Sequence, residues 1–195
     1  MNQRLIDIGL IVAGILEDLE IPYAIGGSVA SGLHGEPRTS IDVDFAVHLD
    51  AAQLEPLATE LEREFYVDRQ SMREAIEAHR LFNVIHLSSL GKIDFHVCPR
   101  SGVFAEELRR ARRVRIRREP EGFARIATPE DTILQKLRWY RAGDEVSDRQ
   151  WRDVLGMVKV VGANLDRDYL DRWARELGVE DLLARALDQG GLGPS

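Results

Sequence analysis

Apolar residues recur along the chain with spacings that predict both helices and strands. In residues 3–19 they recur at helical spacing, and Ile21-Pro22 ends this pattern. Short apolar or alternating runs predict strands at 23–25, 41–47, 81–87, 92–97, 114–117 and 123–127. Further helices are expected at 29–33, 50–64 and 103–110. Pro56 implies a kink in the second of these helices, or a late start near Leu54.

The last third of the chain has an all-helical pattern. Thr128-Pro129-Glu130-Asp131 and Ser147-Asp148-Arg149-Gln150 are helix start signals, and Asp166 is a third expected cap. Residues 88–91 join two strand runs closely enough for an antiparallel hairpin, so the sheet is expected to be mixed. We therefore predict an α/β fold, divided into a mixed β-sheet with flanking helices over 1–127, an all-helical portion over 128–188 and a loose tail over 189–195.

Composition narrows the class of protein. With 195 residues, 44% of them hydrophobic and 30% charged, the chain is in the ordinary globular range. The single cysteine, Cys98, excludes an intrachain disulfide and fits a reducing compartment, so a cytoplasmic location is expected. The longest apolar stretch, Ile8 to Leu16, is shorter than the roughly 20 residues of a membrane span, so no membrane association is expected.

The segment Gly26-Gly27-Ser28 and the pair Asp42 and Asp44 are the first candidates for chemistry. Thirteen residues separate Ser28 from Asp42. Residues i and i+2 of a strand point to the same face, so the two carboxylates project together. Such a pair repels unless a cation lies between its members, and hard oxygen ligands suit Mg²⁺ or Mn²⁺. Glycine turns let backbone N–H groups approach a phosphate, to which a serine at a helix start adds a hydroxyl.

The predicted strand at 92–97 supplies a third acid. Its apolar residues occupy one face and leave Lys92, Asp94 and His96 on the other. If this strand lies beside the strand of Asp42 and Asp44, three carboxylates converge. They could then hold metal ions for phosphoryl or nucleotidyl transfer. His96 could belong to the same site or could simply pack in the fold.

Together these motifs resemble the signature of the nucleotidyltransferase fold of the DNA polymerase beta type. Arg38-Thr39-Ser40-Ile41-Asp42-Val43-Asp44 is similar to the Arg-x-Thr-x-Asp-x-Asp form of minimal nucleotidyltransferases, which include the AbiEii and MenT toxins of type IV toxin–antitoxin systems. Ser40 stands where threonine is usual. The resemblance implies a nucleotidyltransferase-like sheet and metal-dependent transfer of a nucleoside monophosphate from an NTP to an acceptor, which could be an RNA 3′ end, a protein or a small molecule.

The same resemblance assigns roles to individual residues. It implies that Asp42, Asp44 and Asp94 are catalytic metal ligands, and that Gly26, Gly27, Ser28 and Arg38 bind the nucleotide. In the helical portion it implies that Lys136 is catalytic and that Asp153 faces the nucleotide. Gly156 occupies the second acidic position of the family's Lys/Arg-Asp-x-x-Asp pattern. An antitoxin partner protein is a further implication.

Each assignment has a plainer alternative. Asp42 and Asp44 could be a solvated pair on an edge strand, Asp94 a surface acid and Lys136 an ordinary helix cation, while Arg38 could form a salt bridge. The net charge is −7, yet seven of the ten residues from Arg109 to Arg118 are arginine. Arg112, Arg115 and Arg117 could bind an RNA acceptor, or they could be the charged face of a half-buried strand.

Two other functions compete with transfer. One is a catalytically silent nucleotide-binding or regulatory module, which the glycine at position 156 leaves open. The other is a glycosyltransferase that holds a sugar nucleotide with an Asp-x-Asp pair. It is disfavoured because only about 40 residues precede Asp42, too few for the usual nucleotide-binding domain.

Overall fold

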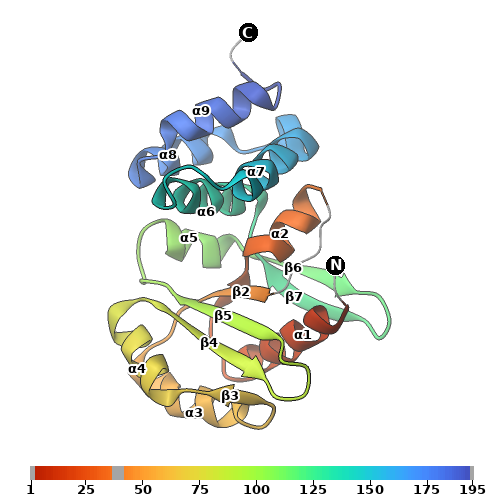
Figure 1. Cartoon of the computed structure of the whole chain (residues 1–195), viewed down its shortest axis with the longest axis vertical. Helices are drawn as coiled ribbons and strands as arrows, with labels where there is room; N and C mark the ends of the chain where they lie inside the picture. Colours follow the sequence, from red (N-terminus) through yellow and green to blue (C-terminus); the bar gives the residue numbers. More distant parts are fainter. Residues whose placement is uncertain (1–2, 37–41, 194–195) are drawn as a thin grey trace. The chain divides into compact units, whose positions relative to one another are not determined.

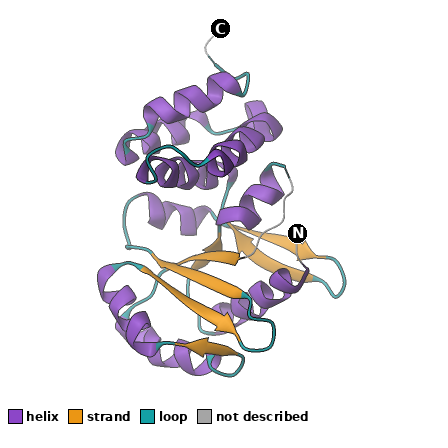
Figure 2. Cartoon of the chain, in the orientation of Figure 1, coloured by secondary structure: helices purple, strands orange, loops and turns teal. Residues whose placement is uncertain are grey.

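The structure is a computed structural model, and it describes residues 3–36 and 42–193. Figure 1 shows the chain with its elements, and Figure 2 distinguishes helices, strands and loops. The chain divides into two compact units. The first comprises Met1–Val29 and Thr39–Ala127, and the second comprises Ala30–Arg38 and Thr128–Ser195. Each unit is described in turn.

In the first unit, the described residues form one mixed sheet of seven strands in the order β3-β4-β5-β2-β1-β7-β6. The neighbours β2 and β5, and likewise β1 and β7, run parallel, whereas the other neighbouring pairs are antiparallel. The mixed sheet expected from the sequence is thus confirmed. The strands are β1 (Tyr23–Ile25), β2 (Asp42–Val47), β3 (Phe65–Val67), β4 (Leu81–His86), β5 (Lys92–Val97), β6 (Arg112–Arg117) and β7 (Gly122–Ile126).

Aromatic rings in the middle of the sheet lock its strands together. The ring centroids of Phe82 and Phe95 are 4.7 Å apart, and the two ring planes are nearly parallel. Phe45 lies 5.6 Å from Phe95 on its other side and 5.7 Å from Tyr23. The row crosses β4, β5, β2 and β1, and all four side chains are buried. Because side chains alternate along a strand, the positions between these rings project from the opposite face of the sheet.

Four helices complete the first unit among its described residues: α1 (Gln3–Asp18), α3 (Ala51–Leu61), α4 (Arg69–Ala78) and α5 (Val103–Arg110). Helix α1 contacts β2, β7 and α3, while α3 and α4 lie side by side next to β3 and β4 (Figure 1). On the face of the sheet that bears Ala24 and Ala46, α5 contributes Leu108 to a small buried cluster. Helices therefore cover apolar positions of the sheet, whereas Tyr66 of β3 and Leu81 of β4 are exposed.

The structure decides one open point of the sequence prediction and adds two elements to it. Helix α3 begins directly at Ala51, because the Asp50 carboxylate accepts hydrogen bonds from the N–H groups of Ala52 and Gln53, and it includes Pro56. The helix start expected at Asp50 is thus confirmed, and of the two alternatives that Pro56 left open, the late start near Leu54 is wrong. Strand β3 and helix α4 occupy a region for which no element was predicted.

The second unit contains helices and no strand among its described residues. It contains α6 (Pro129–Ala142), α7 (Asp148–Val161), α8 (Arg167–Leu177), α9 (Glu180–Gln189) and a short 3-10 turn at Gly162–Asn164. The three expected caps are confirmed, since Thr128, Ser147 and Asp166 each accept a backbone N–H of the following helix. Helix α2 (Gly27–His34) begins in the first unit and ends in the second.

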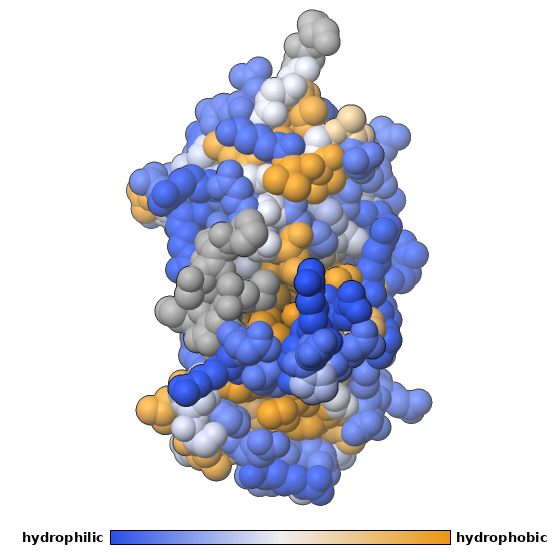
Figure 3. Space-filling model, turned by 90° about the vertical axis from the view of Figure 1, so that its right-hand side faces the viewer, coloured by the Kyte–Doolittle hydropathy of each residue, from blue (hydrophilic) through white to orange (hydrophobic). Residues whose placement is uncertain are grey.

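Polar side chains predominate on the face of the protein drawn in Figure 3, and the apolar ones form separate patches. Over the described part of the chain, no helix combines the length and the apolar character needed to cross a membrane.

Gly35 allows the residues after α2 to lie directly against α7. A Cβ atom at this position would be 2.9 Å from the backbone nitrogen of Met157 and 3.1 Å from the carbonyl carbon of Gly156. Both neighbours belong to a helix backbone, which cannot move aside as a flexible side chain can. The contact between this segment and α7 therefore requires glycine.

We expect Gly35→Ala to destabilise the second unit by about 1–3 kcal/mol, because the added methyl group overpacks a rigid contact. The matched control is Gly143→Ala, since a Cβ there would only reach an ordinary contact of 3.4 Å with the Trp139 carbonyl oxygen. The three tryptophans of the chain lie on α6, α7 and α8, so the urea dependence of their fluorescence reports on this unit. Equal unfolding midpoints for the two variants would contradict the prediction.

Candidate functional site

Parallel pairing of β2 with β5 brings two of the predicted acids together. Asp44 is the register partner of Asp94, and Asp42 is the partner of Lys92. Register partners on neighbouring strands project from the same face, so the Asp44 and Asp94 side chains lie next to each other. The expectation that these two strands are adjacent is confirmed.

Asp94 is a buried carboxylate with one oxygen held by a cation. Its side chain is only 8% exposed, and its Oδ2 atom is 2.7 Å from the Nζ atom of Lys92. Its Oδ1 atom is buried and has no hydrogen-bond partner among the residues that the structure describes. A buried oxygen without a partner costs free energy, so Asp94 is suited to receive a ligand.

Asp44 lies against the glycine turn. A Cβ atom at Gly27 would overlap the Asp44 carboxylate, and the backbone of Gly27 has a positive φ of 54°. The N–H of Gly26 donates to the backbone oxygen of Asp44 at 2.9 Å. On its other side, the Asp44 Oδ1 atom is 3.5 Å from Nε2 of His96. The predicted phosphate turn and the predicted metal ligand are therefore direct neighbours.

The structure describes two of the three remaining sequence candidates for metal or nucleotide binding in the first half of the chain. Ser28 follows the glycines in α2 and is buried, at 6% exposed. Asp42 is half-buried at the start of β2. Arg38 lies outside the described residues.

Charges around Lys92 favour its protonated form. The hydrogen bond to Asp94 is the main cause of its raised pKa, and the negative charges of Asp94, Asp42 and Asp44 add to it. All three predicted metal ligands therefore raise the pKa of Lys92. The sequence placed it on their face of the strand but gave no sign that it would pair with Asp94.

No group of three or more His, Cys, Asp or Glu side chains within residues 3–36 and 42–193 is arranged to hold a metal ion. The metal site on Asp42, Asp44 and Asp94 stays a prediction.

Lys136 and Asp153, the candidates in the second unit, form a buried ion pair. Lys136 Nζ is 2.8 Å from Asp153 Oδ2 and donates to Gln150 Oε1 at 3.1 Å, and both charged side chains are less than 10% exposed. Ser31 adds a hydroxyl donor to the same Asp153 oxygen at 3.4 Å. The pair thus joins α6, α7 and the second half of α2. A role toward a nucleotide stays a prediction.

Gly156, which replaces the expected second acid, is one turn beyond Asp153 on α7. A Cβ atom there would lie 3.5 Å from the backbone nitrogen of Glu36 and 3.6 Å from its Cγ. A carboxylate at this position would approach a second acidic side chain. The glycine therefore suits the local packing.

Arginines of β6 are partly neutralised by the chain's own acids. Arg115 pairs with Glu121 at 2.7 Å, and Arg117 pairs with Asp7 at 2.9 Å. Arg112 is exposed. Strand β6 lies at the edge of the sheet, where charged side chains are common. RNA binding through these arginines stays a prediction.

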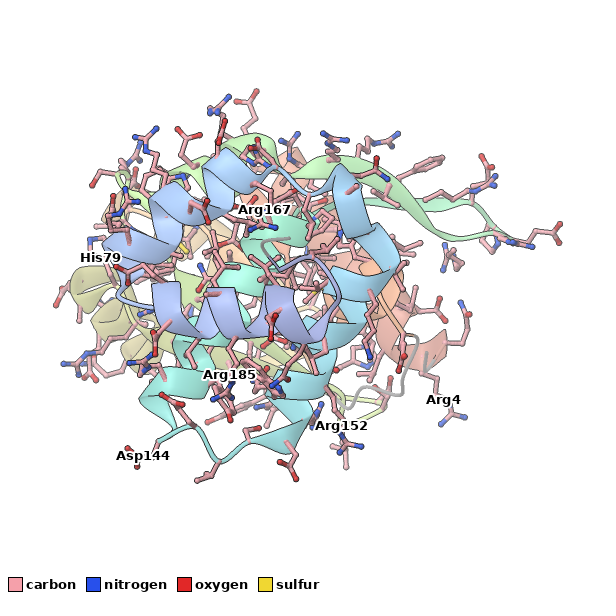
Figure 4. All side chains as sticks on the ribbon, turned by 90° about the horizontal axis from the view of Figure 1, so that it is seen from above. Arg4, His79, Asp144, Arg152, Arg167 and Arg185 are labelled. Atoms are coloured by element: carbon pink, nitrogen blue, oxygen red, sulfur yellow. The ribbon has the colours of Figure 1, made fainter. Side chains whose placement is uncertain are left out.

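Arginines of the second unit take two kinds of position. Arg185 of α9 stacks on the Trp151 ring, with its Cζ atom 3.8 Å from the ring centroid. Arg152 of α7 points away from the helices (Figure 4). Stacking of this kind stabilises packing between helices and identifies Arg185 as a structural residue.

Comparison with known proteins adds a likeness of fold. No protein-family model matches the chain, and no curated protein matches it in sequence. Among solved structures, an antigenic nucleotidyltransferase-like protein from Paracoccidioides brasiliensis has a TM-score of 0.55 and 18% identity, over 96% of this chain and 94% of that one. The lincomycin-bound lincosamide antibiotic adenylyltransferase LnuA has a TM-score of 0.51 and 12% identity, over 82% of this chain and 98% of that one. At such low identities the likeness concerns the fold alone. The chain has a nucleotidyltransferase-like α/β fold.

Proposed function

We propose that the protein is a metal-dependent nucleotidyltransferase, which transfers a nucleoside monophosphate from an NTP to an acceptor. One observation carries this proposal: Asp44 lies in register beside the buried Asp94 and directly against the Gly27 backbone. A carboxylate pair and a glycine turn are the parts that a triphosphate and its cation need. The nucleotidyltransferase-like fold supports the same conclusion.

The donor atoms of this face fit a divalent cation. Asp42, Asp44 and Asp94 offer hard oxygen ligands, and the Oδ1 atom of Asp94 lacks a partner among the described residues. Mg²⁺ usually keeps several waters and binds through few carboxylates together with substrate phosphates. A bound cation supplies positive charge at the reacting phosphate.

The triphosphate would bind at the start of α2. The glycines carry no side chain there, and the first N–H groups of a helix have no partner within the helix and attract anions. The Ser28 hydroxyl would add a hydrogen bond. Transfer breaks the bond between the α-phosphorus and the oxygen that bridges it to the β-phosphate, so pyrophosphate and a nucleotidylated acceptor are the two measurable products.

A catalytically silent module is the second candidate. The observation that favours it is the buried ion pair of Lys136, whose ammonium is already held by Asp153 and Gln150. A lysine bound in this way is not free to contact phosphate unless the pair opens. Pyrophosphate release in the presence of Mg²⁺ or Mn²⁺ distinguishes an active enzyme from such a module.

The toxin–antitoxin assignment is a narrower form of the proposal. It rests on the Arg-x-Thr-x-Asp-x-Asp resemblance, in which Arg38 to Ile41 lie outside the described residues. It predicts that expression of the protein arrests growth and that a partner protein relieves the arrest. An RNA, a protein or a small molecule remains the acceptor to be identified.

We expect Asp42→Asn and Asp44→Asn each to lower transfer by at least about 100-fold, because each removes a charged cation ligand. The measurement incubates the protein with each α-labelled NTP, Mg²⁺ or Mn²⁺, and total cellular RNA or lysate, and follows labelled acceptor and pyrophosphate. Asp144→Asn is the matched control, since Asp144 lies in a turn with a positive φ that asparagine also adopts. Activity of both site variants within tenfold of wild type would overturn the assignment.

We expect Gly27→Ala to weaken binding of an NTP with Mg²⁺ by tenfold or more, measured by calorimetry. The added Cβ atom overlaps the Asp44 carboxylate and strains a backbone with positive φ. Gly14→Ala is the control, because an added Cβ atom at that position of α1 would meet no atom within 4 Å.

Circular dichroism shows whether Gly27→Ala still folds. Ser28→Ala leaves the backbone intact and should also lower the affinity, because it removes one hydroxyl donor. Wild-type affinity in both Gly27→Ala and Ser28→Ala would place the phosphates elsewhere.

A further inference from the structure

Lys92 is the one positively charged side chain that the described residues pair with Asp94. It is the first residue of β5 and lies two residues before Asp94, so both side chains project from the same face. Its register partner on β2 is Asp42. A cation belonging to the chain therefore lies among the three carboxylates proposed to hold a divalent ion.

The two partners of this ion pair differ in their freedom to move. The Lys92 side chain is 45% exposed, whereas the Asp94 side chain is 8% exposed. Lysine can direct its ammonium to water by turning its flexible stem, but a buried carboxylate cannot reach solvent. If a second cation approaches Asp94, Lys92 is the partner able to leave.

The Lys92–Asp94 pair changes the net charge that a divalent cation meets at the three carboxylates. Three carboxylates attract a divalent cation strongly, and a nearby ammonium opposes that attraction. The Lys92 ammonium also occupies one of the two Asp94 oxygens. A divalent cation must therefore share the carboxylate with this ammonium or displace the ammonium.

We propose that Lys92 is a built-in counter-cation, which competes with the divalent ion for Asp94 and keeps the affinity of the site for the free ion low. The inference rests on the proposed function for the identity of the site. A triphosphate brings additional negative charge and restores the attraction, so the divalent ion binds together with the nucleotide.

The test measures Mn²⁺ binding to the full chain without nucleotide, by calorimetry and by the electron paramagnetic resonance signal of free Mn²⁺. We expect Lys92→Gln to bind Mn²⁺ at least tenfold more tightly than wild type. Lys92→Arg keeps the positive charge and should bind within about threefold of wild type. In protein that carries Asp94→Asn, Lys92→Gln should no longer tighten Mn²⁺ binding, because the competition takes place at Asp94.

Two results would overturn the inference. One is equal or weaker Mn²⁺ binding by Lys92→Gln, checked as folded by circular dichroism and repeated with Lys92→Met. The other is a gain that persists in the double variant, which would place the effect away from Asp94. This test can succeed even if the proposed function fails. A gain in Mn²⁺ affinity in Lys92→Gln would support Lys92 as counter-cation, while the absence of pyrophosphate release from both wild type and variant would refute nucleotidyl transfer.

Discussion

The in-register parallel pairing of β2 with β5 is the constraint on which the rest of the site depends. It sets Phe45 beside Phe95 within the aromatic row and, one position earlier on each strand, Asp44 beside Asp94 on the opposite face. A shift of either strand by one residue would move carboxylates toward the aromatic core. The packing of the rings therefore fixes the position of the acids, and core stability and site geometry are linked.

Two adjacent carboxylates in a partly buried site must be compensated. Lys92 compensates Asp94, and His96 lies near Asp44. The glycine turn contributes in a different way, because the missing side chain at Gly27 is what leaves room for the Asp44 carboxylate. The glycine is thus needed for the acid as well as for any phosphate.

In the second unit, too, a buried carboxylate is compensated by a lysine, but there both side chains are buried. Lys136 and Asp153 are both buried, and they satisfy each other with help from Gln150 and Ser31. Removal of one partner from such a pair is costly, because the other charge stays buried and uncompensated. The pair therefore holds α6 to α7.

Sequence alone determined the features that depend on neighbouring residues: the caps at Thr128 and Ser147, the alternation along β2 and β5, and the shared face of Asp42 and Asp44. The tertiary structure decided which strands are neighbours, and it paired Arg117 with Asp7 more than a hundred residues away. Local signals were too weak for β3, which is only three residues long, and for α4, whose composition is mostly polar. The choice of Lys92 as the partner of Asp94, and the contact between Gly27 and Asp44, required the fold. Both depend on distances across strands and turns, which the order of residues along the chain does not specify.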